Sequence, residues 1–279
     1  MEIKFDNVTH SYDFESTVLN NINVEIKKEK INALIGRTGS GKTTMIELIN
    51  ALIKPTIGKI YVDDFVIEDG VKIYHVNDMR LNIGLIFQFP EEQFFCSTVQ
   101  KEIEFGMHYF KYKTDDQQKR IVDSLKMVGL NENYLDRSPF SLSHGEMRKV
   151  AIASILAFNP KLIILDEPTI GLDDESKENL MRLIKLLKLK YKKTIIIISH
   201  DLDMLYNVSD YFYVLDKGNL VLEGEKYEIF KNHKVFEDKH IKIPRIMEFS
   251  NQVMSRKGIK LDFTENIHDL AKEIMKNVR

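Results

Sequence analysis

The stretch from Gly36 to Thr43, GRTGSGKT, has residue types and spacings that suit phosphate binding. Its three glycines lack a Cβ, so the backbone can take positive φ angles and curve closely around an anion. Lys42 stands where its ammonium group reaches terminal phosphates, and the Thr43 hydroxyl stands where it can ligate Mg²⁺. An apolar run precedes the stretch and a helical pattern follows it. This order of strand, turn and helix predicts a nucleoside triphosphate site at the positive end of a helix dipole.

Four more polar residues follow apolar runs that are typical of core strands. Asp166 and Glu167 directly follow the run LIIL, and His200 follows a run of four isoleucines by two positions. Gln88 directly follows the run IGLIF. Because the carboxyl ends of parallel strands meet at one edge of a sheet, we expect these side chains to reach the same phosphate pocket. A carboxylate at Asp166 can hold Mg²⁺, and one at Glu167 can orient or deprotonate a water molecule.

A second anion-binding pattern lies in LSHGEMRKVAIA, residues 142–153. Ser143 and Gly145 stand before a helical pattern in which Val150 and Ile152 are apolar. A serine hydroxyl, backbone N–H groups and a helix dipole together favour an anion at such a helix start. Since the chain already has one phosphate loop, we expect this helix start to cap the nucleotide that another subunit binds.

The elements around these residues alternate between strands and helices. Residues 2–30 show the polar and apolar alternation of an antiparallel sheet, whereas the later runs are apolar throughout, as in parallel strands covered on both faces. Residues 212–224 predict a hairpin that turns at Lys217 and Gly218. Between about residues 91 and 160 the strand-like runs vanish, which predicts a helical insert. The expected fold is α/β, with a mostly parallel core sheet, an N-terminal antiparallel β-subdomain and an α-helical insert subdomain.

The chain is expected to have two parts, a main domain over residues 1–224 and a small helical C-terminal extension over residues 225–279. Apolar side chains recur in the extension at helical spacing, at Ile267, Leu270, Ala271, Ile274 and Val278. Such a stripe fits a helix that packs on its own body, and it fits a contact helix for a partner subunit equally well.

Composition excludes several classes of partner and environment. The 279 residues include 40 basic and 42 acidic side chains, and the net charge of −2 supplies no electrostatic attraction to nucleic acid. The one cysteine, Cys96, allows no intramolecular disulfide and fits a reducing compartment. The N-terminus lacks the pattern of a signal peptide, and no apolar run approaches the ~20 residues that span a bilayer. We therefore expect a soluble chain that docks onto any membrane partner.

The order of these motifs resembles that of ATP-binding-cassette ATPases over residues 2–224. The motifs are the phosphate loop, the glutamine after a strand, the LSxG pattern, Asp-Glu-Pro-Thr, Gly171-Leu172-Asp173 and Ser199-His200. The resemblance implies a P-loop NTPase fold, ATP hydrolysis and Mg²⁺ as cofactor. It implies that Tyr12 stacks on adenine and that the phosphates are bound by Gly36, Arg37, Thr38, Gly39, Ser40, Gly41, Lys42, Thr43 and Thr44.

The same resemblance implies a role for each polar residue at the strand ends. Mg²⁺ would be held by Thr43, Gln88 and Asp166. Glu167 would be the catalytic carboxylate, and His200 would sense the γ-phosphate. In a head-to-tail dimer, the residues that would act on the partner's ATP are Ser143, His144, Gly145, Glu146 and Asp173.

A narrower resemblance lies in FQFPEEQFF, in FSLSHGEMRKVAIASILA and in the tail segment 241–259. These are similar to the ATPases of energy-coupling-factor transporters, and most similar to the second of the two paired types. The resemblance implies that the chain lies at the cytoplasmic face of the cell membrane. There it would power uptake of a vitamin or metal ion. The implied partners are a second ATPase subunit in a heterodimer, a transmembrane coupling subunit and a substrate-binding membrane subunit, with no nucleic acid. Glu91, Glu92 and Phe94 would dock the coupling subunit, and residues 225–279 would contribute to contact between the ATPases.

One departure from the family pattern concerns the signature, which reads LSHGE where LSGGQ is usual. His144 adds a Cβ that restricts the backbone, and Glu146 adds negative charge near a triphosphate. We expect the composite site that uses this signature to be weaker than the site formed by Lys42, Glu167 and His200 with a partner's signature. Thr44 after Thr43 is a conservative difference.

Two alternative functions follow from the same motifs. One is the ATPase of another importer class, for solutes that an extracellular receptor binds. The other is a soluble cassette protein that acts on ribosomes or DNA. Proteins of that second kind carry paired cassettes in one chain or long coiled-coil inserts, and this chain has neither, nor an excess of basic residues.

Overall fold

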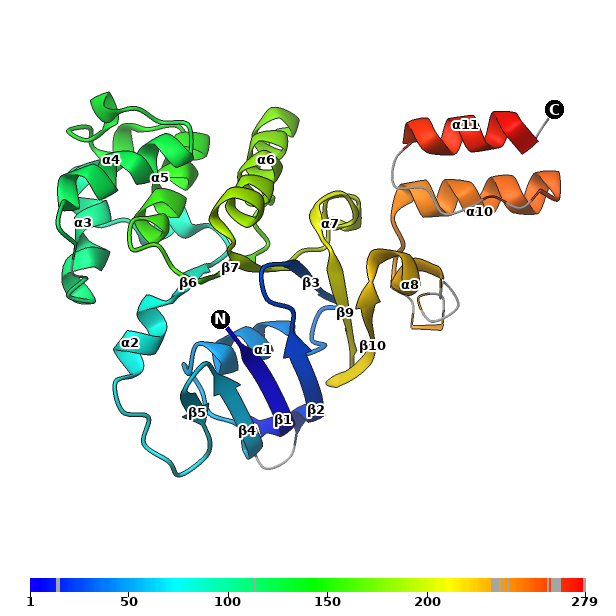
Figure 1. Ribbon diagram of the computed structural model, residues 1–279, viewed down its shortest axis with the longest axis horizontal. Helices are drawn as coiled ribbons and strands as arrows, with labels where there is room; N and C mark the ends of the chain where they lie inside the picture. The colour runs from blue at the N-terminus through cyan, green and yellow to red at the C-terminus, as the bar shows by residue number, and fades with distance from the viewer. Residues whose placement is uncertain are drawn as a thin grey trace.

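The computed structural model describes residues 1–13, 16–112, 114–231, 236, 238–239, 241–259, 261 and 267–277. In this part of the chain the strands form two sheets (Figure 1). The strands are β1 (Ile3–Ser11), β2 (Thr17–Ile26), β3 (Ile31–Gly36), β4 (Ile57–Val62), β5 (Phe65–Ile67), β6 (Ile83–Ile86), β7 (Leu162–Asp166), β8 (Thr194–Ile198), β9 (Tyr211–Asp216) and β10 (Asn219–Glu225).

The first sheet is antiparallel and has the order β2-β1-β4-β5. The second has the order β10-β9-β3-β8-β7-β6, and all of its pairs are parallel except β9 with β10. The expected antiparallel subdomain and mostly parallel core sheet are therefore confirmed. The expected hairpin is confirmed too, because β9 and β10 pair across the turn at Lys217 and Gly218.

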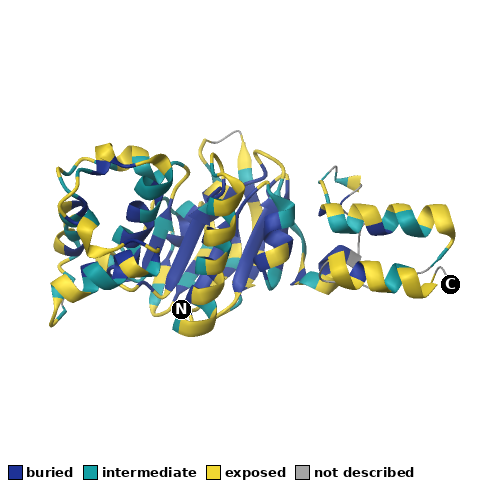
Figure 2. Cartoon of the chain, turned by 90° about the horizontal axis from the view of Figure 1, so that it is seen from above, coloured by how far each residue is buried: buried dark blue, intermediate teal, exposed yellow. Residues whose placement is uncertain are grey.

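The core strands of the second sheet are buried on both faces, which is why their sequences are apolar throughout (Figure 2). Along β7, Ile163 and Leu165 join a helix-side core, whereas Leu162 and Ile164 join an inter-sheet core that lies against the antiparallel sheet. Strand β8 divides its isoleucines in the same way. Each fully buried side chain of this size contributes about 1.5–3 kcal/mol, so these two cores hold the sheet edge that carries the polar residues.

The helices cover the second sheet and extend beyond it. The α-helices are α1 (Lys42–Ile49), α2 (Val76–Leu81), α3 (Val99–Tyr109), α4 (Gln117–Met127), α5 (His144–Leu156), α6 (Asp174–Tyr191), α7 (Leu202–Val208), α8 (Lys226–Lys231), α10 (Arg245–Lys257) and α11 (Ile267–Asn277). Short 3₁₀ helices form at Pro90–Gln93, Glu132–Tyr134 and Pro139–Ser141. Between β6 and β7 the described residues form helices and turns, as the sequence predicts.

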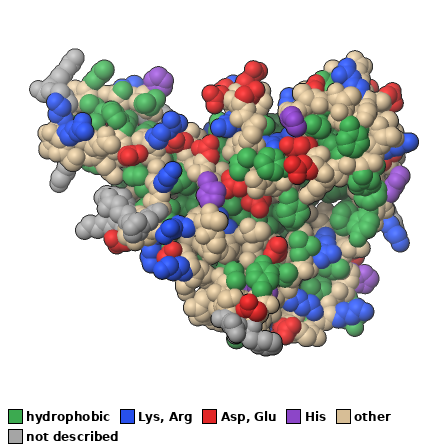
Figure 3. Space-filling model, turned by 180° about the vertical axis from the view of Figure 1, so that it is seen from behind, with side chains coloured by type: hydrophobic (Ala, Val, Ile, Leu, Met, Phe, Trp, Pro, Cys, Tyr) green, Lys and Arg blue, Asp and Glu red, His purple; other side chains and the backbone are tan. Residues whose placement is uncertain are grey.

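Helices α10 and α11 lie side by side at one end of the molecule (Figures 1 and 2). Of the apolar stripe expected in the last helix, Leu270 is buried whereas Ile267 is 67% exposed. Val278, the last member of that stripe, lies outside the described residues. The described helices include none that is both long and apolar enough to cross a membrane. On the face shown in Figure 3, acidic and basic side chains are interspersed.

Gly84 allows β6 to approach α5 closely. A Cβ at this position would overlap Ile155 Cγ2 and would lie 3.0 Å from Pro160 Cγ. We predict that Gly84→Ala lowers the free energy of unfolding by about 1–3 kcal/mol, because the added methyl group overpacks this contact. Urea unfolding measures the change. Adding Ile155→Ala should recover part of the loss, and an unchanged unfolding midpoint in Gly84→Ala would contradict the packing described.

Candidate functional site

The phosphate loop connects β3 to α1 and depends on glycine at two points. A Cβ on Gly36 would overlap the Leu215 carbonyl oxygen, and one on Gly41 would lie 2.5 Å from Leu19 Cδ2. Gly41 is also the N-cap of α1, with a φ of 101°, and as a glycine it has no side chain that could occupy the N–H groups of the first turn. The loop therefore presents the N–H groups at the start of α1 to an anion.

Lys42 folds back over this loop. Its Nζ donates hydrogen bonds to the carbonyl oxygens of Gly36, at 2.8 Å, and Arg37, at 2.9 Å. Burial lowers the pKa of Lys42, while the carboxylates of Glu167 and Asp166 act in the opposite direction. An ammonium group whose hydrogen bonds go to neutral carbonyls is well placed to transfer them to a phosphate.

The two acids at the end of β7, Asp166 and Glu167, occupy different environments. Asp166 ends the strand, and its pKa is raised chiefly by burial and next by the neighbouring Glu167 charge. Glu167 is buried, and its backbone has a φ of 48°, a left-handed conformation that is unusual for this residue type. Its N–H donates to the Ile198 carbonyl at 2.8 Å, which fixes the residue between β7 and β8. Unfavourable conformations of this kind gather at functional sites.

The Glu167 carboxylate faces the residues that follow β8. Its Oε2 accepts hydrogen bonds from the Ser199 hydroxyl, at 3.3 Å, and from the His200 N–H, at 3.2 Å. His200 Nε2 lies 3.5 Å from Oε1, and the His200 side chain is 58% exposed. Among the described residues Oε1 has no hydrogen-bond partner although it is buried. A buried acceptor without a donor calls for a functional explanation, and a water molecule or ligand group would satisfy it.

One cavity of about 310 Å³ brings together the residues that the sequence assigns to phosphate and metal chemistry. Its lining includes Lys42, Thr43, Gln88, Asp166, Glu167 and His200. The hydroxyl, amide and carboxylate oxygens of Thr43, Gln88 and Asp166 are ligand types that Mg²⁺ prefers. Burial and the neighbouring Glu167 charge raise the pKa of Asp166, and a bound divalent cation would oppose both effects. The residues present therefore fit the expected metal.

Tyr12 is not among the residues that line this cavity, but it is fixed to α1 beside one of them, Thr44. The Tyr12 hydroxyl donates to Glu47 Oε2 at 2.8 Å and lies 3.1 Å from Thr44 Oγ1. The ring meets His10 edge-on at a centroid distance of 4.8 Å, and the residue is 59% exposed. An aromatic ring that is anchored at its polar end and open to solvent suits stacking on a base.

The signature residues form a helix start elsewhere on the chain, and the described lining of the phosphate cavity does not include them. Ser143 caps α5 in a capping box with Glu146. The Glu146 carboxylate accepts hydrogen bonds from the Tyr134 hydroxyl, at 2.6 Å, and from the Ser143 N–H and hydroxyl, at 2.9 and 2.8 Å. These bonds, that from Tyr134 first, lower the pKa of Glu146 to about 2. Asp173 caps α6 through the Ser176 N–H at 2.7 Å.

The structure gives Glu91 a contact that differs from the docking role expected of it. Its carboxylate is buried in an ion pair with Arg148 of α5, at 2.8 Å, and both side chains are only 8% exposed. Glu92 is exposed and Phe94 is half-buried, so those two remain open to a partner. Sequence reasoning missed Arg148. The only signal available was its place in the sequence, three residues after Gly145 and within the helix that the signature begins.

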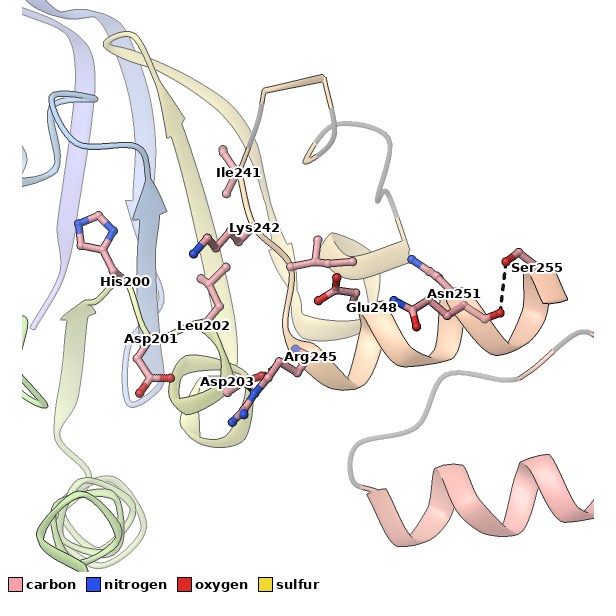
Figure 4. A pocket seen from close by; sticks show the side chains of 12 residues that line it. His200, Asp201, Leu202, Asp203, Ile241, Lys242, Arg245, Glu248, Asn251 and Ser255 are labelled. Atoms are coloured by element: carbon pink, nitrogen blue, oxygen red, sulfur yellow. Dashed lines mark hydrogen bonds and ion pairs between the residues drawn. The ribbon is translucent and has the colours of Figure 1, made fainter. Parts of the chain in front are cut away.

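A larger cavity, of about 850 Å³, lies between the segment after β8 and the tail helix α10. His200 lies near one end of it and Ser255 near the other (Figure 4). Asp203 of α7 accepts hydrogen bonds from the Arg245 backbone N–H, at 2.8 Å, and from its guanidinium group, which ties α10 to α7. No pattern in the sequence indicated this contact.

Comparison with known proteins places these features in a family. The family of ABC transporters matches residues 19–170. The energy-coupling factor transporter ATP-binding protein EcfA2 of Streptococcus agalactiae is 41% identical over 265 residues, which are 94% of each chain. The structure of cbiO1 from Clostridium perfringens, part of the ABC transporter complex cbiONQ, aligns with a TM-score of 0.75 at 32% identity, over 88% of this chain and 97% of that one. A dimeric structure of the ATP-binding cassette MJ0796 with ADP and Pi aligns with a TM-score of 0.71 at 30% identity, over 80% and 98%.

The depressed pKa of Glu146 leads to a prediction about stability and pH. A carboxylate whose pKa falls from 4.5 to about 2 on folding stabilises the folded chain above pH 4.5, and loses that contribution as the pH falls towards 2. The side chain is partly exposed, so solvent screening leaves about 1 kcal/mol at pH 7. Glu146→Gln should therefore lower the free energy of unfolding at pH 7 and lower it less at pH 3, as urea unfolding would measure. An equal loss at both pH values would contradict this assignment.

Proposed function

The chain belongs to the ABC transporter family, and on this premise we propose that it is an ATP-hydrolysing subunit of an energy-coupling factor transporter. The observation that carries the proposal is the cavity of about 310 Å³, where the phosphate loop, an acidic pair and a histidine meet. The 41% identity to EcfA2 over 94% of each chain supports the transporter class. In this role the chain works at the cytoplasmic face of the membrane and drives uptake of a vitamin or metal ion.

The chemistry follows from the groups that line the cavity. The N–H groups of the loop bind the phosphates, and Lys42 transfers its hydrogen bonds from the carbonyls of Gly36 and Arg37 to the terminal phosphates. Glu167 orients and deprotonates the attacking water through its buried carboxylate. His200, beside it, contacts the γ-phosphate. A magnesium ion bound by Thr43, Gln88 and Asp166 would neutralise phosphate charge.

The cavity is half of an ATP site, and a second ATPase subunit supplies the other half. Ser143 and Gly145 belong to a different part of this chain from the phosphate loop, so in a head-to-tail pair they would act on the partner's nucleotide, together with Asp173. The departure of LSHGE from LSGGQ favours a heterodimer, in which a partner's signature completes the site of Lys42, Glu167 and His200. The extension over residues 225–279, beyond the main domain at residues 1–224, contributes to the contact between the ATPases.

A surface beside the phosphate cavity suits a transmembrane coupling subunit. A groove of about 200 Å³, the aromatic groove, is lined by residues of β6, the following loop and helices α3 and α5, including Phe94 and Phe105. Phe95 and Phe105 meet edge-on at 4.6 Å, and Tyr109 stacks beside Phe105. These three rings are 60%, 46% and 61% exposed. Exposed, contiguous aromatic rings are typical of binding surfaces, and Glu92 adds an acidic group for a basic partner residue.

Replacing the catalytic carboxylate tests the proposed hydrolysis. We expect Glu167→Gln to reduce ATP turnover of the assembled transporter by about 10²- to 10⁴-fold while ATP binding is retained, because the amide cannot accept a proton from water. Turnover in proteoliposomes and binding of a fluorescent ATP analogue are the measurements. Glu178→Gln, at an exposed ion pair with Arg182, is the matched control and should keep wild-type turnover. Full turnover in Glu167→Gln would exclude the assigned role.

Purification of the tagged chain from detergent-solubilised membranes of its own cells tests the transporter class. We expect a second ATPase, a transmembrane coupling subunit and a small substrate-binding membrane protein to accompany it, as mass spectrometry would show. Recovery of a pair of transmembrane subunits with an extracellular receptor would favour another importer class instead. Tight association with ribosomes or DNA, and with no membrane protein, would favour the soluble alternative.

A further inference from the structure

Arg148 joins three segments of the chain that have separate roles. Its Nε and Nη2 donate to the two carboxylate oxygens of Glu91, at 3.2 and 2.8 Å. Its Nη1 donates to the Ile170 carbonyl at 2.6 Å and to the Pro168 carbonyl at 3.4 Å. The guanidinium also lies over the Phe89 ring, 5.8 Å from its centroid. One planar, buried group is thus held on several sides at once.

Each of these segments touches a different part of the proposed machinery. Glu91 lies in the 3₁₀ helix Pro90–Gln93, which follows Gln88 and borders the aromatic groove. Residues 168–170 follow Glu167 directly and lead to the Asp173 cap of α6. Arg148 itself lies in the second turn of α5, the helix that Ser143 caps. The guanidinium therefore connects the groove, the loop of the catalytic carboxylate and the signature helix.

The geometry makes this connection stiff. Paired hydrogen bonds between a guanidinium and a carboxylate fix both groups in one plane, which a lysine at this position would not do. Both side chains are 8% exposed, so water does not readily replace either partner. A shift of the 3₁₀ helix that carries Glu91 must then move the guanidinium or break a buried ion pair. When the guanidinium moves, its hydrogen bonds to the Pro168 and Ile170 carbonyls change with it.

We propose that Arg148 is a positioning residue that transmits occupation of the aromatic groove to the loop of Glu167 and to the signature helix. The proposal rests on the proposed function, since it assumes that a membrane subunit fills the groove. It assigns Glu91 to transmission inside the chain, and leaves direct docking to Glu92 and the exposed rings.

The test uses the double variant Glu91→Gln/Arg148→Met in the assembled transporter. This pair removes both buried charges together, so no uncompensated charge remains to unfold the chain. ATP turnover is measured for the two ATPase subunits alone and with the membrane subunits in proteoliposomes. We expect the complex to assemble with an unchanged melting temperature, and the ratio of the two turnover rates to fall about tenfold from the wild-type ratio. A purely structural role would not change this ratio.

The matched control is Arg120→Met. Arg120 of α4 also donates to a carbonyl at this helix, that of the C-cap Ala157, at 3.2 Å, but at the end far from Glu91. It should keep the wild-type ratio. Arg148→Lys should lower the ratio, because a single ammonium group cannot hold Glu91 and the Ile170 carbonyl in one plane.

Several results would overturn the proposal. One is a wild-type ratio in the double variant, and another is an equal fall in both turnover rates, which would confine Arg148 to the active site. A variant that fails to assemble would assign the pair to docking alone. If the wild-type chain bound no membrane subunit, or if its turnover did not respond to one, the proposed function would fail and this inference with it.

Discussion

The parallel register of β3, β8, β7 and β6 is the constraint on which the site depends. Leu34 pairs with Ile198, and Asp166 pairs with the same residue from the other side, so β7 and β8 end level and β3 continues only to Gly36. Their ends bring a loop, an acidic pair and a histidine that are far apart in sequence around one cavity. A slip of one residue would exchange the side chains of the helix-side and inter-sheet cores, so apolar packing on both faces fixes the register.

The same site contains features that oppose folding of the nucleotide-free chain. Glu167 has a left-handed backbone, one of its oxygens is buried without a partner among the described residues, and burial raises the pKa of Asp166. Such features persist because the surrounding sheet determines the backbone position. The buried pair of Glu91 and Arg148 is tolerated only while both members are present. Removing one member of such a pair destabilises a protein by about 3–5 kcal/mol. The groups to which we assign catalysis and transmission therefore depend on the cores that hold them in place.

Much of the fold and the cavity could be predicted from the sequence because their signals are local. Apolar runs marked the parallel strands, and the glycines of the phosphate loop marked a turn that tolerates no Cβ at Gly36 or Gly41. The contacts that were missed join residues distant in sequence. Glu91 and Arg148 are 57 positions apart, and neither periodicity nor composition pairs them. Tail residues were missed for the same reason, since the ion pair of Asp203 with Arg245 is set by how α10 packs on α7.

In the function that we propose, this chain holds half of an ATP site. The most direct measurement is ATP turnover per chain as a function of concentration, for the chain mixed in equal amounts with its second ATPase subunit. We expect turnover that rises with concentration and saturates as the pair forms, because in the proposed function a signature from the other subunit completes the phosphate cavity. If turnover per chain stayed constant when the mixture was diluted until the subunits separated, the half-site would be contradicted.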